Sequence, residues 1–324
     1  MLELTARMSG RTTWTLLDEH DRVLDGAEHS NLILNAGLDA FMVGNSTTFW
    51  SGSNYPYPLF GQFRRYLALG TGSTAPAVTQ TTLAAEVART DSGGGFDGGS
   101  GEIRSAFSST VNSMSVHATH VRVHTFSSPY NITEYGLSAS SGANGALSIR
   151  ELFRDGGGTP VAISVQAGQK IKVTHTLTVT LPLGFQDVTQ PVTNLGNLSA
   201  KQSFYRVNDT NVADFWSYVF NPTSGGILYP QMVADGFNAA VAPGSRSAAG
   251  TITVQPYTNG TYSRVKRCVL DVADGNGNLY GIAISSNTVD GYTGWRMGFT
   301  NPAPLVKDNT KKLTLDVVQS IARG

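Results

Sequence analysis

Three neighbouring histidines are the residues of this sequence that most resemble a metal site. His117, His120 and His124 are spaced by three and four residues, which would place them on one side of a helix. The surrounding residues are rich in β-branched types, however, and these favour a strand. On a strand His120 and His124 share a face with Arg122 between them, while His117 points the other way. Because a guanidinium between two ligands repels a cation, we expect surface or hydrogen-bonded histidines and no metal or other cofactor.

Nucleophilic and acid–base chemistry has no clear signature. The single cysteine, Cys268, lies in an alternating segment among apolar and basic neighbours, which favours a buried, inert thiol over a reactive one. No Gly-x-Ser-x-Gly turn is present to hold a catalytic serine. The glutamates Glu86, Glu102, Glu134 and Glu151 are isolated in sequence. We expect no enzyme; two carboxylates brought together from distant strands, as in a glycosidase, stay open as an alternative.

Two loops are the best candidates for contact with another molecule, because long loops in compact domains are usually functional. Residues 50–60 are rich in aromatic side chains, which stack on sugars or anchor a protein partner; packing onto the domain's own core is the alternative. Residues 91–101 are too glycine-rich to hold a strand or helix without outside contacts. The candidate contact residues of these loops are Trp50, Tyr55, Tyr57, Phe60 and Phe96.

Glu86 and Arg89 are a further candidate contact pair. They are three residues apart, so a helical stretch would bring them together in an ion pair. Pairing with a neighbouring subunit is the alternative.

The composition favours an all-β chain that works by association. Lys+Arg and Asp+Glu are both 23 in 324 residues, and the charged fraction of 14% is well below the ~25% of an average soluble chain. This balance argues against a nucleic-acid partner. A nearly neutral surface also lacks the self-repulsion that keeps monomers apart, which favours contact with copies of the chain. No signal peptide or long apolar stretch is present, so membrane insertion is not expected.

Alternation of apolar and polar residues predicts strands along most of the chain. In the first half we expect a hairpin from strands 2–8 and 12–18 around Ser9-Gly10, and a helix within 31–43 with Leu34, Leu38 and Phe41 on one face. Further strands are expected at 63–70, 102–126, 131–139, 146–153, 160–165 and 170–181.

The second half has a similar pattern. Residues 182–201, with several prolines and glycines, predict a linker between an N-terminal β-rich domain (1–181) and a C-terminal one (202–324). We expect a short helix at 212–219, strands at 250–254, 262–272, 279–285 and 311–322, and a hairpin at the turn 274–278. The order of turns and closing strands matches the first half, either as a weak internal repeat or by chance. The expected fold is all-β, mainly β-sandwich, with one or two short helices in two domains.

The order of several short motifs resembles that of tailed-bacteriophage virion structural proteins of the tail fibre and collar type. These motifs are 31–39 (NLILNAGLD), 66–76 (YLALGTGSTAP) and 82–89 (TLAAEVAR), continued at 132–137 (ITEYGL), 149–153, 160–161 and 168–179. Together they span roughly residues 30 to 181. The second half is similar only in its closing segment, 304–320.

The resemblance implies a non-enzymatic structural subunit of a virion. Such a subunit would be made in the host cytoplasm and would belong to the tail as a fibre, collar, sheath or baseplate-associated protein. It would assemble as a homo-oligomer, with copies of itself and other virion proteins as partners. A host-receptor or carbohydrate-binding tail module, with a host glycan or surface protein as partner, and a head decoration protein stay open as alternatives.

Overall fold

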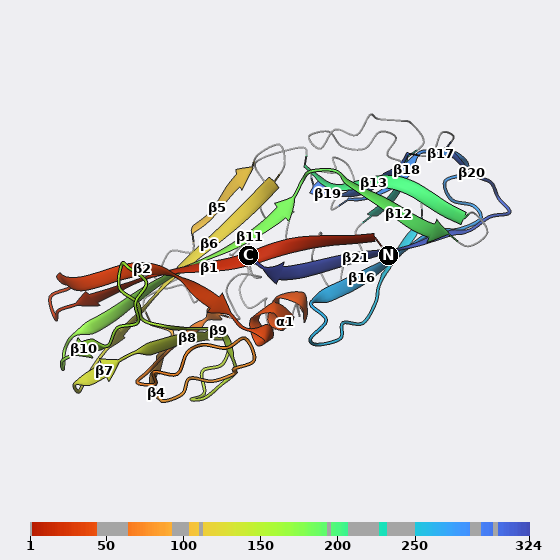
Figure 1. Ribbon diagram of the computed structural model, residues 1–324. Helices are drawn as coiled ribbons and strands as arrows, with labels where there is room; N and C mark the ends of the chain where they lie inside the picture. Colours follow the sequence, from red (N-terminus) through yellow and green to blue (C-terminus); the bar gives the residue numbers. More distant parts are fainter. Residues whose placement is uncertain are drawn as a thin grey trace.

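The computed structural model describes residues 2–43, 64–92, 104–109, 113–192, 196–206, 227–231, 250–285, 293–300 and 304–324. These residues form twenty-one strands and one helix (Figure 1). The all-β class expected from the sequence is therefore confirmed. The sandwich arrangement and the two-domain division stay predictions, and the helix expected at 212–219 lies outside the described residues.

The largest sheet has twelve strands in the order β15-β16-β21-β1-β2-β9-β8-β3-β4, and β11, β6 and β5 branch from β1. Its strands are β1 Leu2–Leu17, β2 Val23–Ile33, β3 Tyr66–Gly70, β4 Glu86–Thr90, β5 Arg104–Ser109, β6 Ser113–Thr125, β8 Glu134–Ser138, β9 Leu147–Leu152, β11 Lys170–Pro182, β15 Thr251–Val254, β16 Ser263–Leu270 and β21 Leu313–Arg323.

A second sheet has five strands in the order β12-β13-β19-β18-β14, and two ribbons pair β7 with β10 and β17 with β20. The five strands are β12 Gln186–Val192, β13 Gly196–Arg206, β14 Ile227–Gln231, β18 Gly281–Ser285 and β19 Thr293–Phe299. The ribbon strands are β7 Tyr130–Ile132, β10 Ile163–Val165, β17 Gly277–Leu279 and β20 Leu305–Lys307.

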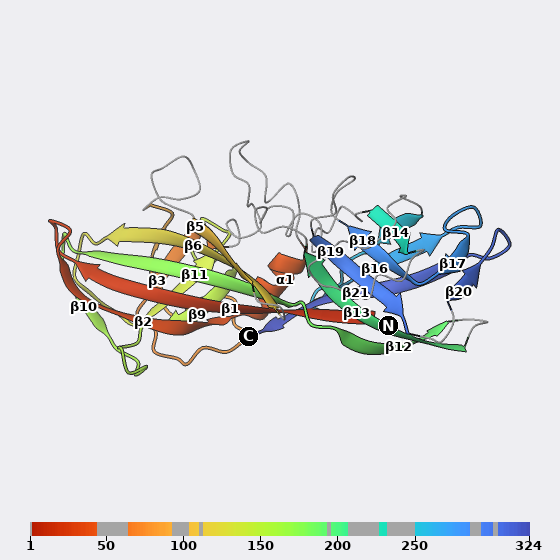
Figure 2. The same ribbon diagram turned by 90° about the horizontal axis from the view of Figure 1, so that it is seen from above.

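β1 joins the two ends of the elongated molecule (Figures 1 and 2). One edge of β1 pairs with β11 from Arg7 to Leu17. The other edge pairs in parallel with β21 from Leu2 to Met8, and antiparallel with β2 from Gly10 to Leu17. Both edges of β1 are therefore occupied over most of its length, and the first and last strands of the sequence lie side by side.

The hairpin expected around Ser9-Gly10 is wrong, because β1 runs through both residues as one strand. Gly10 pairs with Leu177 of β11 and with Asn31 of β2. A Cβ atom at Gly10 would lie 2.4 Å from Asn31 Oδ1. This glycine therefore allows a close approach of a neighbouring side chain and does not mark a turn.

Two segments of the second half differ from the expectation. The stretch 182–201, expected as a linker, carries β12 and the start of β13, which pair antiparallel. Pro191 is compatible with a strand there because β12 is the edge of its described sheet, where a missing N–H breaks no ladder bond. The hairpin expected at 274–278 is wrong: β16 pairs with β15 and β21, whereas β18 pairs with β14 and β19. The matching turn of the first half, 141–145, does join a hairpin, β8 with β9, so the two halves differ in their pairing.

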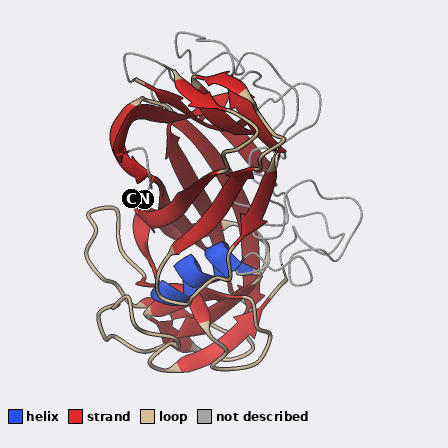
Figure 3. Ribbon diagram, turned by 90° about the vertical axis from the view of Figure 1, so that its right-hand side faces the viewer, coloured by secondary structure: helices blue, strands red, loops and turns tan. Residues whose placement is uncertain are grey.

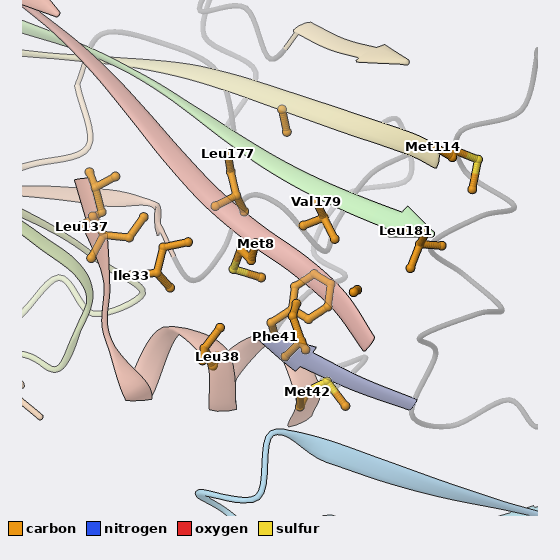
Figure 4. Close-up of a cluster of buried hydrophobic side chains, with 14 of the residues drawn as sticks. Met8, Ile33, Leu38, Phe41, Met42, Met114, Leu137, Leu177, Val179 and Leu181 are labelled. Carbon is orange, nitrogen blue, oxygen red and sulfur yellow. The ribbon is translucent and has the colours of Figure 1, made fainter. Parts of the chain in front are cut away.

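The helix expected within 31–43 is confirmed as α1, Asn35–Val43, while residues 31–33 end β2. Leu38, Phe41 and Met42 are its buried apolar side chains. They face Met8 of β1 and Leu177 of β11 in the main core (Figure 4). The spacing of three and four residues thus buries one stripe of the helix. Within the described part of the chain, no helix is long and apolar enough to cross a bilayer.

Polar contacts fix α1, the helix drawn in blue in Figure 3, which lies near the middle of the long axis of the molecule (Figures 1 and 2). The Asp39 carboxylate accepts hydrogen bonds from the Tyr257 hydroxyl and, at 2.7 Å, from the Gly260 N–H. Arg264 of β16 donates to the Met42 carbonyl at 2.8 Å. An arginine at this position satisfies a carbonyl that the last helical turn leaves unpaired. Segments more than 200 residues apart in the sequence are therefore joined through one helix.

Candidate functional site

Most of the predicted contact residues fall outside the described part of the chain. This is so for the loop 50–60 and for residues 93–101 of the glycine loop. The contact roles of Trp50, Tyr55, Tyr57, Phe60 and Phe96 therefore stay predictions. Glu86 and Arg89 are described.

Glu86 and Arg89 form a buried ion pair on a strand and not on a helix. Arg89 Nε and Nη2 donate to the two carboxylate oxygens of Glu86 at 2.7 and 2.9 Å. The Arg89 and Glu86 side chains are only 6% and 5% exposed. Residues three apart on a regular strand face opposite ways, but the register of β3 and β4 shifts between Leu69 and Gly70 and leaves Val87 as an extra residue. This β-bulge turns the two side chains to the same face.

The Glu86–Arg89 pair fastens the turn between β8 and β9. Arg89 donates to the carbonyls of Ser140 at 2.7 Å and of Gly145 at 3.3 Å. Glu86 accepts the Asn144 N–H at 3.1 Å. The pair therefore works inside the chain, and its contacts do not support the alternative of a bond to a neighbouring subunit.

A second ion pair, Glu134 with Arg150, is fully buried on the same sheet. Arg150 Nη2 and Nε donate to Glu134 Oε2 at 2.7 and 3.1 Å, and both side chains are 0% exposed. Glu134 also accepts three backbone N–H groups, from Gly72, Ala84 and Ala85, at 3.1, 3.2 and 2.8 Å. Five donors thus surround one carboxylate, which offsets much of the cost of removing it from water.

The loop between β3 and β4 wraps around this pair. Arg150 donates to the Gln80 side chain at 2.7 Å and to the Thr74 carbonyl at 2.9 Å. A Cβ atom at Gly72 would lie 2.4 Å from Glu134 Oε1, and one at Gly70 would lie 2.7 Å from the same atom. Gly70 and Gly72, the Gly-x-Gly of the 66–76 motif, therefore pack against Glu134 inside the chain. The spacing of these two glycines was the sign of this packing in the sequence.

Histidines and arginines form another buried cluster beneath β6 and β11. His120, Arg122 and His175 are each at most 1% exposed, and so is Arg64. Arg64 Nη1 donates to His175 Nδ1 at 2.5 Å, which requires the proton of a neutral His175 to lie on Nε2. That nitrogen in turn donates to Asn31 Oδ1 at 3.1 Å. The sequence analysis missed Arg64 and His175, because they reach His120 only through strand pairing.

The three histidines that suggested a metal site are separated by the strand. His120 points into the core beside Arg122, and His117 bonds Thr178 on the opposite face of β6 at 2.8 Å. His124 packs edge-on against Phe126, with ring centroids 4.7 Å apart. Among the described residues, no group of three or more His, Cys, Asp or Glu could hold a metal ion.

Cys268 lies on the inner face of β16 and is 2% exposed. Burial raises the pKa of its thiol to about 12. Since the thiolate is the reactive form, this environment makes the thiol inert, as the alternation of the segment predicts.

The outward face of β6 and β11 is the candidate docking surface. The two strands pair antiparallel over their full length. Their outward side chains hydrogen-bond across the strands in three consecutive rungs: Ser115 with Thr180 at 2.8 Å, His117 with Thr178 at 2.8 Å and Thr119 with Thr176 at 2.6 Å. These side chains are half-buried, and we call them the threonine ladder. The six side chains of the ladder include no Asp, Glu, Lys or Arg, and their hydroxyl groups are ordered. Basic residues border it: Arg7 and Arg11 of β1 pair with Thr180 and Thr176, and Lys170 and Lys172 lie further along the outward face of β11.

Comparison with known proteins gave no match: no family model, no curated protein and no solved structure matches the chain. The resemblance to phage tail proteins therefore stays a prediction.

Replacing Arg150 should lower the free energy of unfolding far more than replacing an exposed arginine. We expect Arg150→Met to lower the free energy of unfolding by about 3 to 5 kcal/mol, because it leaves the buried Glu134 carboxylate without its partner. Arg11 pairs with Glu28 at the surface, where the side chains are 70% and 41% exposed. Arg11→Met should therefore cost less than about 1 kcal/mol. Urea denaturation measures both, and equal losses in the two variants would contradict the assigned role of Arg150.

Stability should fall when the pH drops below about 6.5. Burial, and then the Arg64 guanidinium, hold the pKa values of His120 and His175 well below the ordinary value. A histidine with a lowered folded-state pKa binds its proton more readily in the unfolded chain, so its stabilising contribution is present above the unfolded pKa and is lost on acidification. Each such histidine should lower the free energy of unfolding by about 1.4 kcal/mol for each pH unit below about 6.5.

The measurement is chemical denaturation between pH 7.5 and 5. His175→Gln should reduce the slope of unfolding free energy against pH. His20→Gln, at a side chain that is 68% exposed, is the control and should leave the slope unchanged. A flat profile in the unsubstituted chain would show that these histidines are not buried as neutral groups.

Proposed function

We propose that this chain is a non-enzymatic assembly subunit that docks to copies of itself through the threonine ladder. The observation that carries the proposal is the threonine ladder of β6 and β11, in which hydroxyl groups already bond one another. Groups that are paired before association lose few water contacts when the surface is covered.

The placement of the charged side chains supports a structural role. Three of the four isolated glutamates each pair with an arginine of the chain: Glu86 with Arg89, Glu134 with Arg150 and Glu151 with Arg154. The fourth, Glu102, lies outside the described residues. The paired carboxylates are bonded to internal donors and are not presented to a substrate. These glutamates therefore do not support the glycosidase alternative.

We also propose that the chain belongs to a virion, on the basis of the order of its motifs. The motifs that resemble tail fibre and collar proteins include Gly70, Gly72, Glu134 and Arg150. In this chain those four residues are packed together in one buried network. A motif of this kind maintains a scaffold, which fits a tail subunit whose partners are copies of itself and other virion proteins.

The proposal is tested by mass photometry and analytical ultracentrifugation over a range of concentrations. The chain should form a discrete homo-oligomer. Thr176→Lys should weaken that oligomer at least about tenfold, because it places a positive charge on one rung of the ladder in every copy. Thr253→Lys, at an exposed threonine of β15, is the matched control and should leave the oligomer intact.

Two results would overturn the docking role of the ladder. One is a chain that stays monomeric at every concentration tested. The other is an oligomer that Thr176→Lys and Thr253→Lys weaken equally, while both variants keep the unfolding free energy of the original chain.

A further inference from the structure

A groove lies between the edges of β2 and β10. Both strands lie at the same end of the molecule (Figures 1 and 2). β2 pairs with β1 over residues 23–31 but reaches its other neighbour, β9, only at Leu32 and Ile33. β10 pairs with β7 and with no other described strand. The space between β2 and β10 has a volume of about 450 Å³. This size is typical of ligand sites, which span ~300 to 1,000 Å³.

The floor of the groove is apolar and its two walls are strand edges. Trp14 and Leu16 of β1 form the floor, residues 25–27 of β2 form one wall, and residues 161–164 form the other. Trp14 is 2% exposed, its Nε1 donates to the Arg154 carbonyl at 2.8 Å, and its ring packs edge-on against Phe153. An indole held in this way cannot offer a face for a sugar ring to stack on, so the groove does not favour a carbohydrate.

The charged side chains that line the groove are two carboxylates, Asp25 and Asp155. Asp25 Oδ1 accepts the Gly26 N–H at 2.7 Å. Asp155 Oδ1 accepts the N–H groups of Gly157 and Thr159 at 2.9 and 2.8 Å. These bonds hold the carboxylates in place, and among the described residues the second oxygen of each has no hydrogen-bond donor. An occupant with positive charge would therefore be favoured over a neutral or acidic one.

We propose that the groove binds an extended peptide segment with basic side chains, which adds as a strand between β2 and β10. Exposed strand edges recognise extended peptides through main-chain hydrogen bonds, while pockets for alternate side chains give specificity. Here apolar side chains of the segment would point to Trp14 and Leu16, and basic ones would reach Asp25 and Asp155. The inference goes beyond the proposed assembly role and does not depend on it, because the groove floor lies on the inward face of β1, whereas the threonine ladder lies on the outward face of β6 and β11.

The test is fluorescence anisotropy of a labelled hexapeptide of alternating valine and lysine added to the full chain. The peptide should bind. A peptide of the same charge in which prolines replace two valines lacks the N–H groups for strand pairing, and an alternating valine–glutamate peptide has the wrong charge. Both should bind at least about tenfold more weakly.

Variants of the groove locate the binding. Asp25→Asn with Asp155→Asn keeps each Oδ1 acceptor, so the chain should fold normally and bind the valine–lysine peptide about tenfold more weakly. The control, Asp187→Asn with Asp271→Asn, makes the same change in net charge at side chains that are 84% and 58% exposed, and should bind as the original chain does. Ala162→Trp should block the groove and abolish binding.

Several outcomes would overturn the proposal. They are no binding at peptide concentrations up to about 1 mM, equal binding of the proline peptide, or equal loss in the two double variants. Binding of cellohexaose in place of the peptide, lost in Ala162→Trp, would also overturn it and would identify a carbohydrate site.

Discussion

Backbone pairing along both edges of β1 is the constraint on which the rest of this structure depends. β1 has 16 residues, about three times the usual strand length, and serves three partners. Its first part holds β21 and, through β21, β16. Its second part holds β2 and β11, and β11 in turn holds β6. Because one continuous strand contributes to both ends, neither end can lose β1 without exposing apolar residues of a shared core.

The distribution of charge follows from the same architecture. A chain with 14% charged residues places several of them inside, as ion pairs and as arginines that bond backbone carbonyls. Buried ion pairs contribute little net stability, but removing one partner is costly, so such pairs specify one arrangement of the loops. In this fold they hold the β3–β4 loop and the β8–β9 turn. The six side chains of the threonine ladder themselves carry no such charge, and the arginines that border them, Arg7 and Arg11, come from β1.

Local patterns in the sequence predict local structure well here and predict contacts poorly. The strict alternation of β11 and the apolar stripe of α1 both appear in the structure, since each depends only on neighbouring residues. Gly10 and the turn 274–278 were misinterpreted because their conformation is decided by strands far away in sequence.

The contacts of the candidate site were even harder to predict from local patterns in the sequence. The spacing of Glu86 and Arg89 predicts their ion pair, but the bulge that makes it possible on a strand depends on the register with β3. Glu134 and Arg150, Arg64 and His175, and the two walls of the groove meet only through tertiary pairing, so no spacing could reveal them.

Native-state hydrogen exchange tests the role of β1 most directly. Amides of β1 that bond β21 and those that bond β11 should exchange through the same global opening, with equal free energies and equal dependence on denaturant. The amides of β16 should follow them, since β16 is attached through β21. If β21 and β16 instead open at a free energy well below that of β11 and β6, the two ends unfold separately and β1 does not unite them.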